Sequence, residues 1–235
     1  MSLSNVSVVL VHGAWADGSS WSKVIERLEE QGIPTVAAPL PLTSLSDDVA
    51  ALDRVLERID APVVLAGHAY AGGVVGATRS ANVEALVYVA ALAPDEGETV
   101  GEVFYRGESH PQAPQLAPDA HGLIWLPQEA FGQAFAQEAT PQELAVLSAV
   151  QRPISVACIG EAVGRPLWKD RPSWFLVAEQ DRMINPATQH FMADRMNAQV
   201  RSHQVDHTPS VTAPDVVTDV IVEAVRSVSA RVSVR

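Results

Sequence analysis

The chain has 235 residues, of which 47% are hydrophobic and 19% charged, as expected for a folded globular protein with a substantial core. Its formal net charge of -12, without clustered Lys and Arg, argues against nucleic acid and anionic membranes as partners. Cys158 is the only cysteine, so an intramolecular disulfide is excluded. Neither a signal peptide nor an apolar run of roughly 20 residues is evident, and we therefore expect a cytoplasmic protein.

Short apolar segments rich in β-branched residues alternate with helical patterns along most of the chain. Near-continuous hydrophobicity is what a parallel strand needs when helices cover both faces of its sheet. We therefore predict strands at residues 7–11, 34–38, 62–66, 85–90, 174–178 and 200–205.

Helical patterns separate these segments. The first begins behind Ser19 or Ser20 as N-cap and ends at Gly32. The second follows Ser46, and the last begins at Pro214. Strand and helix in this alternating order predict an α/β fold with a doubly wound, mainly parallel sheet.

The alternation stops at residues 94–172, which contain no convincing strand. Prolines punctuate the first half of this stretch, and short helical patterns surround Phe131 and Leu147 in the second half. The stretch is too long for a simple connection. We predict a helical cap over the carboxyl ends of the strands, inserted into a core formed by residues 1–93 and 173–235. A small subdomain without a role at the site is the alternative.

A strand, a tight turn of small residues and the start of a helix follow one another at residues 62–73. Within them, residues 67–71 have the sequence Gly-His-Ala-Tyr-Ala, close to the Gly-x-Ser-x-Gly pattern of a nucleophile elbow. Ala71 replaces the second glycine, which is a mild change. Ala69 replaces the nucleophilic serine, so the attacking oxygen is missing. Taken alone, the segment would favour an ordinary tight turn, and only the other motifs together argue against that interpretation.

The loop after the first strand, residues 11–15, has the sequence Val-His-Gly-Ala-Trp. In sheets of this kind the loop supplies one backbone N–H of an oxyanion hole, and the residue after the nucleophile supplies the other. Ala14 and Tyr70 are therefore the candidate oxyanion donors.

Two later loops carry the candidate partners of a nucleophile. Asp181 follows the fifth predicted strand as the candidate acid, with Glu179 as a weaker rival, and His207 follows the last strand as the candidate base. The chain order of position 69, Asp181 and His207 is that of hydrolases with a nucleophile elbow. The spacing of His203 and His207 could suggest a metal, but no third ligand is evident, so we expect no metal and no cofactor.

Apolar residues near these loops are the candidate substrate contacts. They are Trp15, Trp125, Leu126, Phe131 and Phe135. Each could instead be core, because aromatic residues at helical spacing usually pack inward. As substrate contacts they predict a medium-sized, largely apolar ester or lactone, a small-molecule partner.

The motifs together resemble a bacterial esterase family of the α/β-hydrolase superfamily, related to the plant methylesterases and hydroxynitrile lyases. The residues that carry the resemblance are 11–15, 67–73, 178–182 and 206–208, and the similarity extends over essentially the whole chain. It implies an α/β-hydrolase fold with a helical cap and a buried pocket. Hydroxynitrile lyases have a threonine where this chain has Gly13, which favours ester hydrolysis over cyanohydrin cleavage.

By this resemblance the triad positions are Ala69, a serine in the family, Asp181 and His207. The implied oxyanion donors are Ala14 and Tyr70. We favour a serine-type carboxylic-ester hydrolase inactivated by substitution of its nucleophile. The histidine, the acid and the oxyanion loop are all present, and only the side chain at position 69 lacks its hydroxyl. A natural non-catalytic ligand-binding homologue, and a lyase or cofactor-free oxygenase on the same scaffold, are the alternatives.

Overall fold

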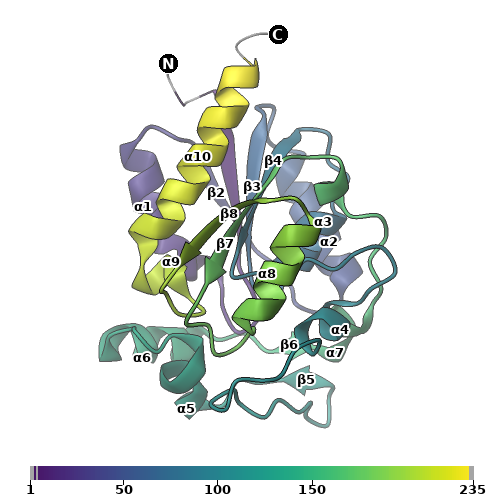
Figure 1. Cartoon of the computed structure of the whole chain (residues 1–235), viewed down its shortest axis with the longest axis vertical. Helices are drawn as coiled ribbons and strands as arrows, with labels where there is room; N and C mark the ends of the chain where they lie inside the picture. The colour runs from purple at the N-terminus through teal and green to yellow at the C-terminus, as the bar shows by residue number, and fades with distance from the viewer. Residues whose placement is uncertain (1–2, 4, 233–235) are drawn as a thin grey trace.

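Six parallel strands form the central sheet, in the order β2-β1-β3-β4-β7-β8 (Figure 1). The computed structural model describes residue 3 and residues 5–232. The strands of the sheet are β1 (Ser7–Val11), β2 (Thr35–Ala38), β3 (Val63–His68), β4 (Val83–Val89), β7 (Ser173–Ala178) and β8 (Gln199–His203). The chain moves from β1 to one edge and then returns past β1 towards the other edge, so the predicted doubly wound fold is confirmed. The order reverses between β1 and β3, where open α/β sheets bind their ligands.

Helices cover both faces of this sheet. One face packs against α1 (Ser22–Glu30) and α10 (Pro214–Val232), and the other against α2 (Leu45–Leu56), α3 (Ala71–Ala77) and α8 (Pro186–Arg195). Along β1, Val8 and Leu10 enter the first core while Val9 and Val11 enter the second. This alternation explains why the inner strands β1, β3 and β7 are buried along their whole length, because helices cover both of their faces.

Helix ends differ slightly from those predicted. The side chain of Ser44, rather than Ser46, accepts the hydrogen bond from the Asp47 N–H that caps α2. A 3-10 turn, Gly18–Trp21, capped by Asp17, precedes α1 and includes the two serines expected as caps. Pro214 begins the last helix as predicted.

Residues 94–172 contain two short strands, so the expectation of none in this stretch is wrong. Strands β5 (Leu123–Ile124) and β6 (Ile154–Ser155) pair antiparallel, and two residues are too few for a periodic pattern. The helices of this stretch are α4 (Val100–Phe104), α5 (Gln128–Ala130), a π-helical turn (Phe131–Phe135), α6 (Pro141–Val150), α7 (Val156–Gly160) and a 3-10 turn (Leu167–Lys169).

Much of this stretch lies against the loops that follow the sheet strands, as Figure 1 shows for α5, α6 and β5. The Trp15 N–H, in the loop after β1, donates to the Arg152 carbonyl at 3.1 Å. The Thr208 hydroxyl, just after β8 and before α9 (Pro209–Thr212), donates to the Phe135 carbonyl at 2.6 Å. The stretch therefore contacts the carboxyl ends of the strands directly. In the part of the chain that the structure describes, no helix has the length and apolar character needed to cross a membrane.

The close approach of α3 to the segment after β4 requires a glycine. A Cβ on Gly72 would lie 2.2 Å from the Leu92 carbonyl oxygen, a distance that the backbone must widen. A Cβ on Gly160, at the end of α7, would meet nothing within 4 Å.

We predict that Gly72→Ala lowers the free energy of unfolding by about 2 kcal/mol or more, because α3 must move away from Leu92. Gly160→Ala is the matched control and should change this free energy by less than about 1 kcal/mol. Urea denaturation of both variants measures the difference. Equal stabilities for the two would contradict the packing described for α3.

Candidate active site

Ala69 occupies the sharp turn between β3 and α3. Its φ of 50° lies in the left-handed region, which costs a non-glycine residue about 1–3 kcal/mol. Its carbonyl oxygen accepts hydrogen bonds from the N–H groups of Gly72 at 3.1 Å and Leu92 at 3.0 Å, which hold the turn in place. The Ala69 side chain lines a cavity at this end of the sheet. This sharp turn from strand to helix therefore presents the side chain of residue 69 to the cavity.

His207 and Asp181 form a buried pair beside the same cavity. His207 Nδ1 lies 2.8 Å from Asp181 Oδ2, and their side chains are 2% and 0% exposed. The N–H groups of Met183 and Ile184 donate to Asp181 Oδ1 at 2.7 and 2.8 Å. A carboxylate already surrounded by donors accepts the Nδ1–H of His207. The other ring nitrogen of neutral His207, Nε2, is then free to take up a proton.

Gln189 is a member of this network that the sequence did not reveal. Its Nε2 donates to Asp181 Oδ2 at 2.8 Å and to the Ile184 carbonyl at 3.0 Å, and its Oε1 accepts from the Ala178 N–H at 3.0 Å. The residue is fully buried on α8. Gln189 therefore holds the carboxylate of Asp181 in place from α8. A glutamine within a helix carries no motif, so no sequence signal pointed to it.

The loop after β1 passes directly over the turn at residue 69. A Cβ on Gly13 would lie 3.1 Å from the Ala69 Cβ and 3.0 Å from the His68 carbonyl oxygen, so only glycine fits there without a shift. Ala14 and Tyr70 line the cavity next to Ala69. Among the described residues, neither of their N–H groups donates to another backbone group outside the regular elements. Both are thus available to a ligand in the cavity, as an oxyanion hole requires.

Two further histidines, His12 and His68, form hydrogen bonds that stabilise the loops around the cavity. His12 Nε2 accepts from the Leu40 N–H at 3.0 Å, so its Nδ1 carries the proton and donates to the Gly13 carbonyl at 2.9 Å. His68 Nε2 donates to the His207 carbonyl at 2.7 Å. Burial lowers the pKa of His12, and burial together with the neighbouring His207 lowers the pKa of His68 to about 3. Both rings are therefore neutral and structural near pH 7.

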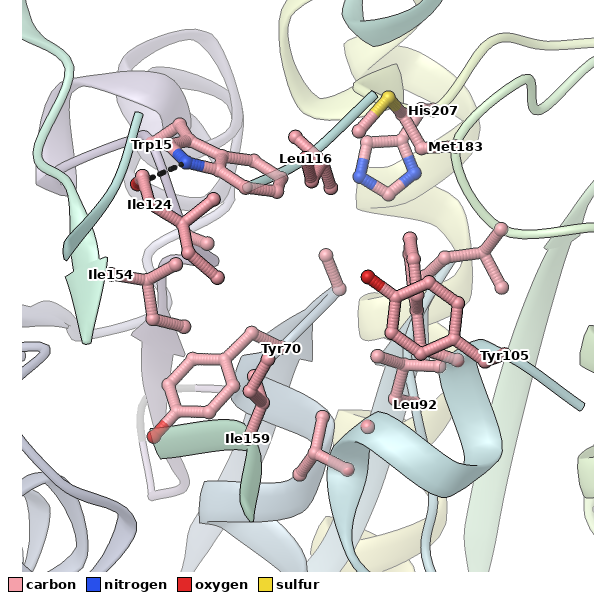
Figure 2. Close-up of a pocket in the computed structure, with 16 residues that line it drawn as sticks. Trp15, Tyr70, Leu92, Tyr105, Leu116, Ile124, Ile154, Ile159, Met183 and His207 are labelled. Carbon is pink, nitrogen blue, oxygen red and sulfur yellow. Dashed lines mark hydrogen bonds between the residues drawn. The ribbon is translucent and has the colours of Figure 1, made fainter. Parts of the chain in front are cut away.

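The cavity is almost entirely apolar. The space between its lining residues, with the open mouth included, is about 570 Å³, and the enclosed part of the cavity holds only about 50 Å³. Figure 2 shows Trp15 on one side and Tyr105 on the other, with His207 and Met183 next to one another. No Asp, Glu, Lys or Arg of the described residues lines it. The Tyr70 hydroxyl is turned away from His207 and donates to buried Asp48 at 2.6 Å.

Of the five predicted substrate contacts, only Trp15 lines this cavity. Trp125 is 49% exposed, and its indole N–H donates to an Asp119 carboxylate oxygen outside the cavity. Leu126, Phe131 and Phe135 are buried but lie outside the lining. The prediction for these four residues is corrected: Leu126, Phe131 and Phe135 pack into the core of the stretch, and Trp125 lies at its surface.

Phe135 keeps an indirect connection to the site. Its ring centroid lies 5.3 Å from that of His207 and 6.3 Å from that of Trp15. It therefore packs behind the ring of His207 rather than against a ligand. The residues that line the cavity in place of the four include Tyr105, Leu116, Ile124, Ile154 and Met183. They come from separate segments without a shared motif, which is why the sequence did not single them out.

Residues 8–220 of the chain match the alpha/beta hydrolase family. No curated protein matches the chain. A pyrethroid hydrolase from Sphingobium faniae is 21% identical with a TM-score of 0.79, and the alignment covers 94% of this chain and 98% of that one. A methylesterase from Arabidopsis is 16% identical, with a TM-score of 0.76 and coverage of 94% and 99%. An extracellular α/β-hydrolase from a Paenibacillus species is 17% identical, with a TM-score of 0.76 and coverage of 93% and 98%. At these identities the solved structures show a shared fold.

The neutral state of His68 makes stability depend on pH. In the unfolded chain a histidine takes up a proton below pH ~6.5, whereas folded His68 does so only near its pKa of about 3. The free energy of unfolding therefore falls as the pH drops below ~6.5, and His68 contributes about 1.4 kcal/mol per pH unit to that slope. We predict that His68→Gln, which keeps a donor for the His207 carbonyl, reduces the slope between pH 6 and pH 5.

Urea denaturation at these two pH values measures the slope. His121→Gln is the control, because His121 is exposed and its replacement should leave the slope unchanged. If His68→Gln retains the full slope, His68 is not held neutral in the folded protein.

Proposed function

The chain belongs to the alpha/beta hydrolase family, and we propose that it is a serine-type carboxylic-ester hydrolase whose nucleophile position holds alanine. The observation that carries this proposal is the convergence of three parts on one cavity. The left-handed turn at Ala69, the His207–Asp181 pair and the free N–H groups of Ala14 and Tyr70 all border it. An acyl-transfer site needs these parts in this arrangement.

The proposed mechanism follows from the geometry around residue 69. A serine hydroxyl there attacks the ester carbonyl while His207 Nε2 takes its proton, and Asp181 stabilises the resulting imidazolium. The N–H groups of Ala14 and Tyr70 bind the oxyanion. His207 then returns the proton to the leaving alcohol, and water releases the acid from the acyl-serine. With Ala69 no acyl-enzyme forms, and a loss on the order of 10⁶-fold in rate is expected.

The lining of the cavity supports an uncharged, largely apolar ester or lactone as substrate. A carboxylate on the substrate would find no cationic side chain there, and burying an unpaired charge is costly. The proposed role of residues 94–172 is that of a cap, because Tyr105, Leu116, Ile124 and Ile154 of this stretch close the cavity over the sheet. A methylesterase and a pyrethroid hydrolase among the structural relatives are compatible with such a substrate. The cytoplasmic location stays a prediction, and one relative is extracellular.

The direct test restores the missing oxygen. We predict that Ala69→Ser hydrolyses short aryl esters at least about 10⁴-fold faster than the present chain, because every other part of the triad is in place. Release of p-nitrophenol from its acetate and butyrate esters measures the rate. The matched control is the double variant Ala69→Ser/His207→Gln, which keeps the hydroxyl without its base and should return to background.

An Ala69→Ser protein that is folded but inert would overturn the proposal. Ester binding by that inert protein would favour the non-catalytic ligand-binding alternative. Proton abstraction that depends on His207 and proceeds equally well with Ala69 would favour the lyase or oxygenase alternative.

A further inference from the structure

The cavity has two walls of different construction. On one side Trp15 donates its indole N–H to the Ile124 carbonyl at 2.9 Å, and Ile124 pairs with Ile154 across the two short strands. These three side chains form a fixed apolar surface, which we call the tryptophan wall. Figure 2 shows it facing Tyr105 across the cavity.

The opposite wall separates the cavity from a second one. Phe104, Tyr105, Leu116 and Met183 line both cavities, and we call these four residues the boundary wall. Tyr105 is 58% exposed, so its side chain can turn without giving up a buried position. The boundary wall is therefore the place where a ligand can pass from one cavity into the next.

The second cavity is more polar than the first. Ser109, His110 and Gln115 line it together with prolines of the same stretch. It lies near the surface and offers a ligand the polar side chains of Ser109, His110 and Gln115.

The boundary wall adjoins the catalytic base. One carboxylate, that of Asp181, accepts both the His207 ring at 2.8 Å and the Met183 N–H at 2.7 Å, which fixes Met183 next to His207. Figure 2 shows these two side chains next to one another. The tryptophan wall instead continues from Ala14, the proposed oxyanion donor that precedes Trp15 in the chain.

This arrangement distinguishes the two halves of an ester. The histidine must return its proton to the leaving oxygen, so the alcohol half lies on the side of His207. We propose that the alcohol half passes between Met183 and Tyr105 into the second cavity, and that the acyl half lies against the tryptophan wall. This inference rests on the proposed hydrolase function. It assigns to the site an apolar, uncharged acyl group and a bulky alcohol group that carries hydrogen-bonding atoms.

Two substitutions that add volume test the two walls separately. Leu116→Phe narrows the boundary wall, and because Leu116 is only partly buried this variant should fold. Ile154→Phe enlarges a side chain of the tryptophan wall and so reduces the space beside it. Because Ile154 is 2% exposed and the larger ring can perturb folding, Ile154→Ala, which enlarges the same wall, is the second variant there.

Each substitution is made in the Ala69→Ser background and tested on two ester series. In one series acetate is fixed and the alcohol grows from methyl to naphthylmethyl; in the other the methyl alcohol is fixed and the acyl chain grows. Leu116→Phe should lower kcat/KM for the ester of the bulkiest alcohol about ten-fold or more relative to methyl acetate. It should leave the dependence of kcat/KM on the length of the acyl chain unchanged. Ile154→Phe should penalise long acyl chains alone, and Ile154→Ala should favour them.

The dissociation constants of the same esters with the Ala69 chain, which is not expected to turn them over, should show the same division. Leu116→Phe acting on the acyl series, or both walls acting equally on both series, would overturn the assignment while Ala69→Ser remains an active hydrolase. An Ala69→Ser enzyme inert towards every ester would overturn the hydrolase function itself, and the assignment with it.

Discussion

The left-handed backbone at residue 69 is the constraint on which the rest of the site depends. It holds the end of β3 and the start of α3 at a sharp angle, and it persists only because neighbouring backbone packs tightly around it. Gly72 lets Leu92 reach the carbonyl of residue 69, and Gly13 lets the loop after β1 lie on its side chain. A chain that needed only a turn here could avoid this strain. The conformation is useful to a residue whose side chain must react, yet the side chain present is a methyl group.

The histidine network shows the same specialisation for proton transfer. Asp181 receives hydrogen bonds from two backbone N–H groups and from Gln189, so its second oxygen is directed at His207. The ring of His68 lies 4.8 Å from that of His207, where a second positive charge would compete with protonation of the base. Burial keeps the pKa of His68 at about 3, and this competition is absent near pH 7. Of the two rings, His207 is the one that lines the cavity.

The sequence predicted the parts of the protein that depend on local patterns. Strands buried on both faces, such as β3 and β7, are rich in apolar residues. Ala69, Asp181 and His207 each follow a parallel strand of the sheet, so their meeting at one end of the sheet follows from the topology. The lining of the cavity depends on tertiary packing instead. Trp125, Phe131 and Ile154 are all apolar, and only their packing decides that Ile154 alone reaches the cavity. For the same reason Gln189 and the two-residue strands could not be predicted.

We propose that a single missing oxygen separates this chain from a working serine hydrolase. The most direct measurement is covalent labelling of residue 69 by a fluorophosphonate, followed by intact-mass and peptide mass spectrometry. The reagent reacts with a serine only when a base and an oxyanion hole activate it. We predict one adduct on residue 69 of Ala69→Ser and none on the present chain. A folded Ala69→Ser protein that acquires no adduct would contradict it.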